Sequence, residues 1–341
     1  MSDPLPNTMK ACCVNEFGPP EAIVLEDLPI PVPAAGEVLV RVAAAGVGPW
    51  DGWIRAGKSA LPQPLPLTLG SDLSGTVAAV GPNVSAFRPG EPVFGVTNPR
   101  FTGACAEYAI AQAGMITHRP EGLAEIDAAA LPVIAVTAQQ ALFDQAGLQP
   151  GQTVLIHGGA GNVGALAVQL AHQAGLQVIA TASERDAASV RSLGAGRVID
   201  YRTARFEDEV TGVDAVIDLV GGDVQARSFR VLRPGGALIS AVSEPDRQEA
   251  TRRQVRAGFF LVQVTTAALD RIAALVQAGR LVARVGTVLP LEAIRTAHEM
   301  LEGTRPHSRG KIVLRIALKE IEAGIRPVRE GSRDLNQANT R

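Results

Sequence analysis

The pattern of apolar and polar residues changes near residue 130. From about residue 9 to residue 130 the apolar runs are short and β-rich, and Pro and Gly separate them. Turn signals lie close together between these runs, for example Gly-Pro-Asn at 81–83. This texture is typical of a barrel-like antiparallel domain with little helix. The clearest predicted strands are 37–42, 75–80 and 92–95.

Beyond residue 131, apolar strands alternate with Ala-rich helical stretches. This alternation is the signature of βαβ units in a parallel sheet. After the first strand, apolar residues recur at helical spacing and predict a helix over 162–174 that packs on the sheet. Because the unit repeats, the fold class is α/β with a doubly wound parallel sheet. The predicted strands are 153–157, 177–181, 198–200, 213–219 and 236–242.

The chain of 341 residues exceeds the size at which one hydrophobic core stops growing, so we expect two domains. Residues 317–341 are polar and charged, which predicts a loose helix or a disordered tail. A strand-like segment at 311–314 should return the chain to the first domain. The expected limits are 1–130 for the first domain, 131–280 for the parallel-sheet domain, 281–316 for the return and 317–341 for the tail.

Composition and charge narrow the class of protein. Lys and Arg number 32 against 34 Asp and Glu, a formal net charge of −2, so no nucleic acid partner is expected. The three cysteines, Cys12, Cys13 and Cys105, form neither a disulfide framework nor a Cys-x-x-Cys zinc spacing, which favours a reducing cytoplasm. Residues 1–10 do not resemble a signal peptide, and glycines interrupt the longest charge-poor segment. We therefore expect a cytoplasmic protein with no membrane partner.

A Gly-x-Gly-x-x-Gly motif stands directly after the first predicted strand of the parallel sheet and directly before a helix. In this position the first glycine permits a tight turn, the second lets the backbone approach a diphosphate, and the third lets helix and strand pack closely. The start of the helix then faces the anion with free N–H groups. The alternative is an ordinary turn in a glycine-rich chain. The predicted dinucleotide site is Gly159, Ala160, Gly161, Asn162, Val163 and Gly164.

The end of the second strand indicates which nicotinamide cofactor binds. An NAD enzyme places an acid there to hold the ribose 2′-hydroxyl, but residues 181–183 are Thr-Ala-Ser. A 2′-phosphate at this place would meet Ser183, the cation Arg185 and the hydroxyl of Tyr201. The sequence therefore predicts NADPH. The alternative is that Arg185 is an ordinary surface charge and that Glu184 supplies the acid.

Several motifs together resemble one known family. They are Pro-Ala-Ala-Gly-Glu-Val-Leu-Val-Arg-Val at 33–42, Ala-Ala-Gly-Val-Gly-Pro-Trp-Asp at 44–51, Leu-Gly-Ser-Asp-Leu-Ser-Gly at 69–75, the glycine motif and Arg-Gly-Lys-Ile-Val-Leu at 309–314. The chain resembles the quinone oxidoreductase and alkenal (enone) reductase branch of the zinc-independent medium-chain dehydrogenase/reductases. This resemblance implies a GroES-like β-barrel-type first domain, a Rossmann second domain, a cleft between them and a homodimer joined through the Rossmann sheets.

The same resemblance indicates that no metal is used. Zinc-dependent relatives place a Cys in the Ala-Gly-Val-Cys segment and a His in a Gly-His-Glu segment, where this chain has Gly48 and Ser71. Neither residue offers a thiolate or an imidazole to zinc. Without a Lewis acid, hydride addition to a conjugated acceptor is favoured because the charge spreads to a distant oxygen. The expected function is NADPH-dependent hydride transfer to a small-molecule quinone or α,β-unsaturated carbonyl compound.

Further site residues follow from matching places in the family. Trp50 and Trp53, the only two tryptophans, would sandwich a flat acceptor or simply cap a core. Asp51 would orient water or the ribose, or form a turn, and Tyr108 is either a proton donor or a structural strand residue. His157 is expected to pack rather than to catalyse. The remaining cofactor contacts, each also explained by strand-end packing, are Thr137 at the nicotinamide ribose, Val220, Gly221, Ala241 and Val242 beneath the cofactor, and Phe260 and Val262 at the nicotinamide ring.

Two other functions remain open from the sequence. An enoyl-thioester reductase shares the zinc-free scaffold, and the basic residues Arg252, Arg253 and Arg256 would either serve its acidic substrate or form a solvated helix face. A non-catalytic NADPH-binding or structural protein would keep the same fold and the same glycine motif. Turnover of NADPH with quinones and alkenals separates these alternatives.

Overall fold

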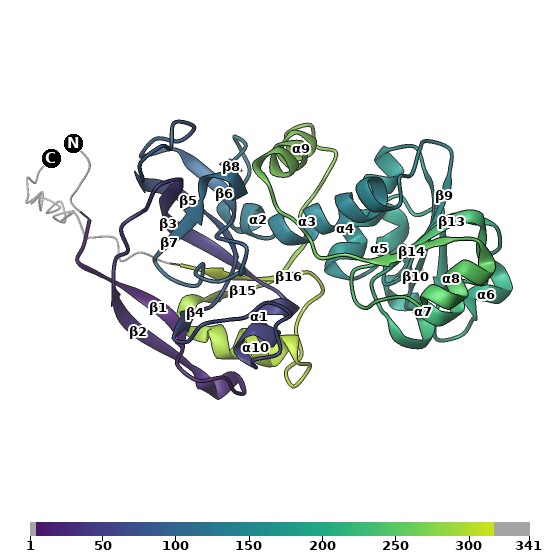
Figure 1. The fold of residues 1–341 in the computed structure, drawn as a ribbon, viewed down its shortest axis with the longest axis horizontal. Helices are drawn as coiled ribbons and strands as arrows, with labels where there is room; N and C mark the ends of the chain where they lie inside the picture. The colour runs from purple at the N-terminus through teal and green to yellow at the C-terminus, as the bar shows by residue number, and fades with distance from the viewer. Residues whose placement is uncertain (1–4, 317–341) are drawn as a thin grey trace, which may run out of the picture.

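The computed structural model describes residues 5–316 of the chain. One end of the elongated molecule holds mainly antiparallel strands, and the other holds a parallel sheet flanked by helices (Figure 1). The predicted polar tail, 317–341, lies outside the described residues. Within the described part of the chain, no helix is long and apolar enough to cross a membrane.

The antiparallel part consists of two sheets. A small sheet has the order β2-β1-β4, and a larger one has the order β15-β16-β3-β5-β6-β8 with β7 paired to β3. Only the β15–β16 pair in the larger sheet is parallel. The strands are β1 (Thr8–Val14), β2 (Ile23–Pro29), β3 (Glu37–Val47), β4 (Leu67–Thr68), β5 (Asp72–Val80), β6 (Pro92–Val96), β7 (Tyr108–Gln112), β8 (Ile116–His118), β15 (Val285–Pro290) and β16 (Lys311–Arg315).

Short helices complete this part: α1 (Pro49–Arg55), α2 (Glu125–Ala129) and α10 (Ile294–Leu301). Strand β16 pairs antiparallel with β3, with Ile312 opposite Val47, and so brings the C-terminal segment back to the first sheet. The exact domain limits given above stay a prediction.

The parallel sheet has the strand order β11-β10-β9-β12-β13-β14, and all of its neighbouring strands are parallel. This confirms the α/β class. The order reverses between β9 and β12, which is where dinucleotides bind in doubly wound sheets. The strands are β9 (Thr153–Ile156), β10 (Gln177–Ala182), β11 (Arg197–Asp200), β12 (Val213–Asp218), β13 (Leu232–Ser240) and β14 (Arg256–Phe259).

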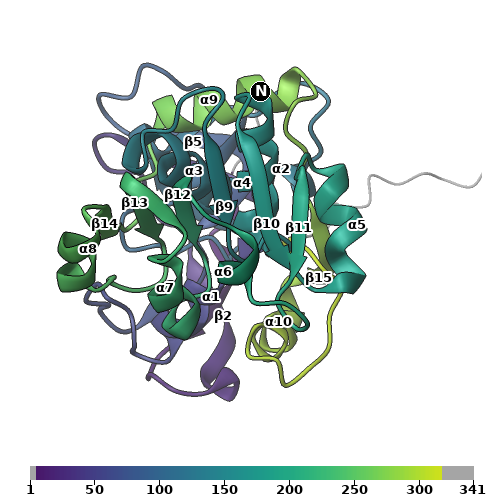
Figure 2. The same cartoon turned by 90° about the vertical axis from the view of Figure 1, so that its right-hand side faces the viewer.

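Helices lie on both faces of this sheet (Figure 2). Figure 2 shows α5 beside the edge strand β11 and α8 beside the opposite edge strand β14. The helices are α3 (Pro132–Gln139), α4 (Asn162–Gln173), α5 (Glu184–Ser192), α6 (Phe206–Glu209), α7 (Gly222–Ser228), α8 (Arg247–Arg253) and α9 (Thr266–Gln277).

Two features of the sheet differ from the sequence prediction. Strand β14 was not predicted, because Arg-Ala-Gly-Phe is too short and too irregular to give a strand pattern. Strand β13 begins at Leu232 rather than at residue 236, since its Arg-Pro-Gly-Gly segment suggests a turn. The structure accommodates that segment by a register shift against β12.

The largest hydrophobic cluster joins the two parts of the molecule. It contains Phe94 and Val96 of β6, most of α3, and Val154 and Ile156 of β9. Because α3 packs on α4 and also on the first part of the chain, it holds the two walls of the intervening cleft together.

Candidate active site

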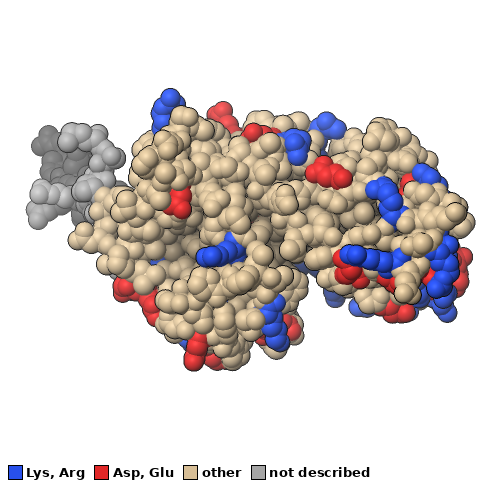
Figure 3. All heavy atoms as spheres, in the orientation of Figure 1, with Lys and Arg blue, Asp and Glu red and all other residues tan. Residues whose placement is uncertain are grey.

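A cleft of about 1310 Å³ lies between the two parts of the molecule. On one wall are α1 and the loop segments 58–61 and 99–101, and on the other are the glycine motif and the C-terminal ends of β10 to β13. Residues 259–264 form a further side. In Figure 3 charged side chains gather over the end of the molecule that holds α6 to α8, whereas the middle of this face carries few.

The glycine motif closes the turn between β9 and α4. A Cβ on Gly164 would lie 2.1 Å from the carbonyl oxygen of Gly158, and one on Gly159 would lie 2.9 Å from Cβ of Ala180. Gly161 is less confined, because its Cβ would lie 3.2 Å from the same Gly158 oxygen. Gly161 is the N-cap of α4 and lines the cleft. The start of a 12-residue helix therefore faces the cleft, as an anion site requires.

The region expected to hold the ribose contains a carboxylate that the sequence analysis missed. Asp186, in the first turn of α5, lines the cleft and accepts a hydrogen bond of 2.5 Å from Ser183 Oγ. Arg309 Nη2 lies 2.7 Å from the same carboxylate. Burial acts to raise the pKa of Asp186, but the Ser183 hydrogen bond and Arg309 outweigh it and lower the pKa. Asp186 is thus an ionised carboxylate whose charge is balanced by Arg309.

The two other residues predicted here differ in position. Tyr201 lines the cleft and is 55% exposed. Arg185 does not line it; its side chain is 68% exposed, and its Nε lies 3.6 Å from Oδ2 of Asp186. The cleft cation nearest in sequence to Tyr201 is Arg205, which was not predicted.

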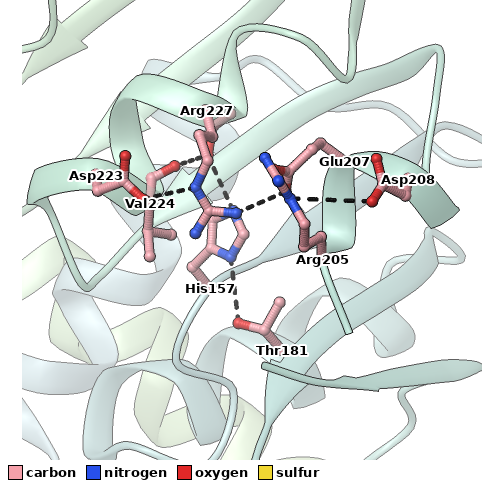
Figure 4. A network of polar contacts seen from close by, with 9 residues as sticks. His157, Thr181, Arg205, Glu207, Asp208, Asp223, Val224 and Arg227 are labelled. Carbon is pink, nitrogen blue, oxygen red and sulfur yellow. Dashed lines mark hydrogen bonds and ion pairs between the residues drawn. The ribbon is translucent and has the colours of Figure 1, made fainter. Parts of the chain in front are cut away.

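His157 is part of a buried network shown in Figure 4. Its Nδ1 lies 3.2 Å from Thr181 Oγ1, and its Nε2 lies 3.0 Å from Ser228 Oγ. Burial lowers the pKa of His157 to about 4, so the ring is neutral near pH 7. Both ring nitrogens have hydroxyl partners, which matches the expected packing role.

The same view shows two guanidinium groups held by one carboxylate. Glu207 accepts hydrogen bonds from Arg205 at 2.9 Å and from Arg227 at 2.7 Å. Arg227 also pairs with Asp223 at 2.8 Å. The cations on this side of the cleft are therefore fixed in place by their acidic partners.

Most of the predicted cofactor contacts lie together in the cleft. Asp218 fixes the backbone at the end of β12, because its Oδ1 accepts hydrogen bonds from the N–H groups of Val220 at 3.0 Å and Gly221 at 2.8 Å. Gly221 has φ 80°, and neither it nor Gly159 lines the cleft. The predicted residues that do line it are Thr137, Ala160, Gly161, Asn162, Val163, Gly164, Ser183, Tyr201, Val220, Ala241, Val242, Phe260 and Val262.

Trp50 and Trp53 of α1 both line the opposite wall. Trp50 Nε1 donates a hydrogen bond of 3.0 Å to Ser71 Oγ, and Lys311 Nζ lies 4.2 Å from the centre of the indole ring. A Cβ on Gly48 would lie 2.3 Å from that ring. The indole of Trp50 therefore fits only because residue 48 has no side chain.

A fully buried ion pair supports this wall. Lys311 Nζ and Asp72 Oδ2 are 2.8 Å apart, and both side chains are 0% exposed. The other carboxylate oxygen of Asp72 accepts the N–H of Val133 at 3.0 Å, at the start of α3. The pair thus connects β5 and β16 to the helix that leads into the parallel sheet.

The structure does not bring the two predicted catalytic candidates into the cleft. Asp51 is 1% exposed, and its Oδ2 accepts the N–H of Gly48 at 2.7 Å, which is the turn-forming alternative. Burial raises the pKa of Asp51 to about 7. Tyr108 on β7 packs with Met9, Leu39 and neighbouring apolar residues away from the cleft lining.

Comparison with known proteins agrees with this architecture. Residues 34–123 match the family model of the alcohol dehydrogenase GroES-like domain, and residues 193–314 match that of the zinc-binding dehydrogenases. A Rossmann sheet beside a GroES-like part, with a cleft between them, defines an oxidoreductase of the medium-chain dehydrogenase/reductase class. The chain belongs to this family.

Individual relatives show which members of this family the chain is similar to. The human quinone oxidoreductase is 33% identical over 90% of this chain and 97% of its own length. A tomato 2-methylene-furan-3-one reductase is 35% identical over 71% of this chain and 65% of its own length. The Coxiella burnetii quinone oxidoreductase structure has a TM-score of 0.84 at 37% identity, covering 91% of this chain and 100% of that one. A mycobacterial protein solved with NADPH has a TM-score of 0.78 at 30% identity, covering 90% and 99%.

One of the two matching family models is that of the zinc-binding dehydrogenases. The side chains at the corresponding positions of this chain do not fit a zinc ion. Catalytic zinc needs three nitrogen, sulfur or oxygen side chains around one open position. The indole of Trp50 lies against Gly48 and donates a hydrogen bond to Ser71. Zinc-dependent relatives carry ligands at these two positions. Within residues 5–316, no group of three or more His, Cys, Asp or Glu side chains could hold a metal ion.

Proposed function

We propose that this protein is an NADPH-dependent oxidoreductase that transfers hydride, without zinc, to quinones or α,β-unsaturated carbonyl compounds. The observation that carries the proposal is the cleft itself: one wall is an intact dinucleotide motif, and the other holds an indole in place of metal ligands. Relatives named as a quinone oxidoreductase and a furanone reductase support the acceptor class.

The glycine motif and the start of α4 would hold the diphosphate, because residues 160–164 line the cleft and a helix N-terminus attracts an anion. The reduced nicotinamide, when bound, supplies the hydride. Phe260 and Val262 would limit water around its ring, and Thr137 would contact the adjacent ribose. Trp50 and Trp53 would orient a flat acceptor by stacking. Water at the open side of the cleft would supply the proton.

The preference for NADPH rests on the cations around the ribose region. Arg205 and Arg309 line the cleft with Ser183 and Tyr201, and each can approach a 2′-phosphate. The carboxylate of Asp186 opposes this preference, but Arg309 balances its charge at 2.7 Å. Arg185 lies outside the cleft lining and would act only as a more distant charge.

The reaction is tested by following NADPH and NADH oxidation with menadione, an alkenal and a plain ketone, each with and without a chelator. We expect turnover with the first two acceptors, unchanged by the chelator. Ethanol oxidation that a chelator abolishes would overturn the zinc-free reaction. NADPH that binds without turnover of any acceptor would instead indicate a non-catalytic binder.

Cofactor choice is tested separately by dissociation constants. Removing Arg205 or Arg309 should weaken NADPH more than NADH, since only NADPH carries the extra phosphate, whereas Arg185→Ala should have a smaller effect. Equal losses for both cofactors would refute the 2′-phosphate role.

The proposed enzyme is cytoplasmic and forms a homodimer through its parallel sheets. The edge strand β14 supports this assembly, because its outer side pairs with no other strand among residues 5–316. Sedimentation at micromolar concentration tests it, and a monomer would refute it. The sparse cysteines support the reducing compartment.

A further inference from the structure

The charge of the cleft lining is strongly one-sided. The whole chain carries a formal net charge of −2, yet the residues that line the cleft include only one carboxylate, Asp186. A cleft attracts anions through those cations that acidic partners do not neutralise. The cations that line it are Lys58, Arg100, Arg205, Arg227, Arg309 and Lys311.

Four of these six cations already have acidic partners. Arg205 and Arg227 share Glu207. Arg309 pairs with Asp186, and Lys311 pairs with Asp72 inside the protein. Lys58 and Arg100 form no ion pair with any residue of the described segment 5–316 and are both exposed. They are the two cations of the cleft lining that have no acidic partner among these residues.

Lys58 and Arg100 lie on the acceptor side of the cleft, away from the glycine motif. The N–H of Lys58 donates to the carbonyl oxygen of Trp53 at 2.8 Å, which places it directly after the helix that carries both tryptophans. Arg100 precedes Phe101, another residue of the cleft lining. Each cation therefore lies close in the chain to an aromatic residue of the cleft lining.

The two segments are also tied to each other. Gln63 Nε2 donates to the carbonyl oxygen of Arg100 at 3.0 Å and lies 3.4 Å from Ser59 Oγ. The loop that follows Lys58 and the loop that carries Arg100 thus form one continuous wall. An apolar surface bounded by two unpaired cations fits a molecule with a flat apolar body and an anionic end.

We propose that the acceptor of this enzyme carries an anionic group, a carboxylate or a phosphate, that Lys58 and Arg100 bind while its conjugated part lies against Trp50 and Trp53. This inference rests on the function proposed above and specifies its substrate class. The anion has two chemical sources: a carboxylate on a small enone or quinone, or the phosphates of a thioester carrier.

The test compares matched acceptors in the full-length protein. The first pair is benzalacetone carrying a ring carboxylate and the methyl ester of the same compound; the second is crotonyl-4′-phosphopantetheine and crotonyl-pantetheine, which lacks the phosphate. Turnover of the neutral ester tests the proposed function alone. The difference between the members of each pair tests the anion site.

Lys58→Gln and Arg100→Gln should each raise KM for the anionic member about two- to fivefold, with kcat and the neutral member unchanged, as for an exposed ion pair. Added salt should raise KM for the anionic member in the wild type and much less in the double variant. Arg247→Gln is the matched control, because that side chain is 83% exposed, is ion-paired and lies outside the cleft lining.

The outcomes separate the possibilities. An effect confined to the carboxylate pair identifies a small acid, and one confined to the thioester pair identifies a carrier. Equal KM values for charged and neutral members in the wild type would overturn the proposal. A weaker dissociation constant for NADPH in the variants, with unchanged acceptor KM, would assign the two cations to the cofactor and also overturn it. Failure of every acceptor would instead count against the proposed function.

Discussion

The buried pair of Asp72 and Lys311 gives the sharpest test of how this cleft is supported. The two charges are 2.8 Å apart with no exposed side-chain surface, so each is stabilised by the other and by few further groups. Removing one partner of such a pair leaves an uncompensated buried charge and costs about 3–5 kcal/mol. Replacing both by uncharged residues of similar size is often close to neutral.

The two single changes should differ in their pH dependence. Lys311→Met leaves the carboxylate of Asp72, whose pKa burial already raises and Lys311 opposes. Without Lys311 this pKa rises further, so the folded state holds a proton that the unfolded chain releases near its ordinary pKa of about 4. The stability of Lys311→Met relative to wild type should therefore fall as pH rises from about 4 toward the folded-state pKa. Asp72→Asn keeps an acceptor for the N–H of Val133 and leaves the ammonium unpaired.

Denaturant unfolding of the wild type, both single variants and the double variant measures the coupling. Circular dichroism follows the whole fold, and tryptophan fluorescence follows the indole of Trp50, which Lys311 contacts. We expect the double variant to lose less stability than either single variant. Additive losses, or single losses below about 1 kcal/mol, would show that the pair is not a tightly coupled buried charge pair.

Three further predictions concern the cleft and its surroundings. Gly161→Val adds a side chain to the cleft lining where the diphosphate is expected, so NADPH affinity should fall at least tenfold while the thermal midpoint changes little; an unchanged dissociation constant would refute the site. Burial raises the pKa of Asp51 to about 7, so as pH rises the unfolded chain loses this proton before the folded protein does. The wild type should therefore lose stability relative to Asp51→Asn between about pH 4 and pH 7. A difference in thermal midpoint that stays constant over this range would contradict this reasoning. Gly48→Asn must displace the indole of Trp50, because a Cβ there lies 2.3 Å from the ring, and unchanged tryptophan fluorescence and acceptor selectivity would speak against the contact.

The parts of the fold that the sequence predicted are those with local signals. Strand β9, the glycine motif and α4 follow one another closely in the chain, and each has its own pattern of apolar spacing or glycine placement. Strand β14 has no such pattern, because four residues at the sheet edge are defined by their pairing with β13. Pairing of this kind depends on tertiary contacts that a single sequence does not display.

The carboxylate in the ribose region was missed for a related reason. The end of β10 itself carries no acid, but Asp186 in the first turn of α5 accepts a hydrogen bond from Ser183, which precedes the helix. The cation nearest to Asp186, Arg309, lies 123 residues further along the chain. An acid in the first turn of the helix that follows β10 is a signal that could have identified Asp186. No local sequence pattern points to Arg309.

Gly48 and Ser71 bear both on the zinc question and on the aromatic surface of this cleft. From the sequence alone, Gly48 and Ser71 stand where zinc-dependent relatives carry ligands. That comparison identifies the missing ligand side chains but not what occupies their space. In the structure the absent side chain of Gly48 makes room for the indole of Trp50, and the hydroxyl of Ser71 accepts its N–H. Restoring ligand side chains at these two positions would therefore meet the indole, unless Trp50 were shortened as well. The two residues, which offer neither thiolate nor imidazole, thus position the ring against which the proposed acceptor would stack.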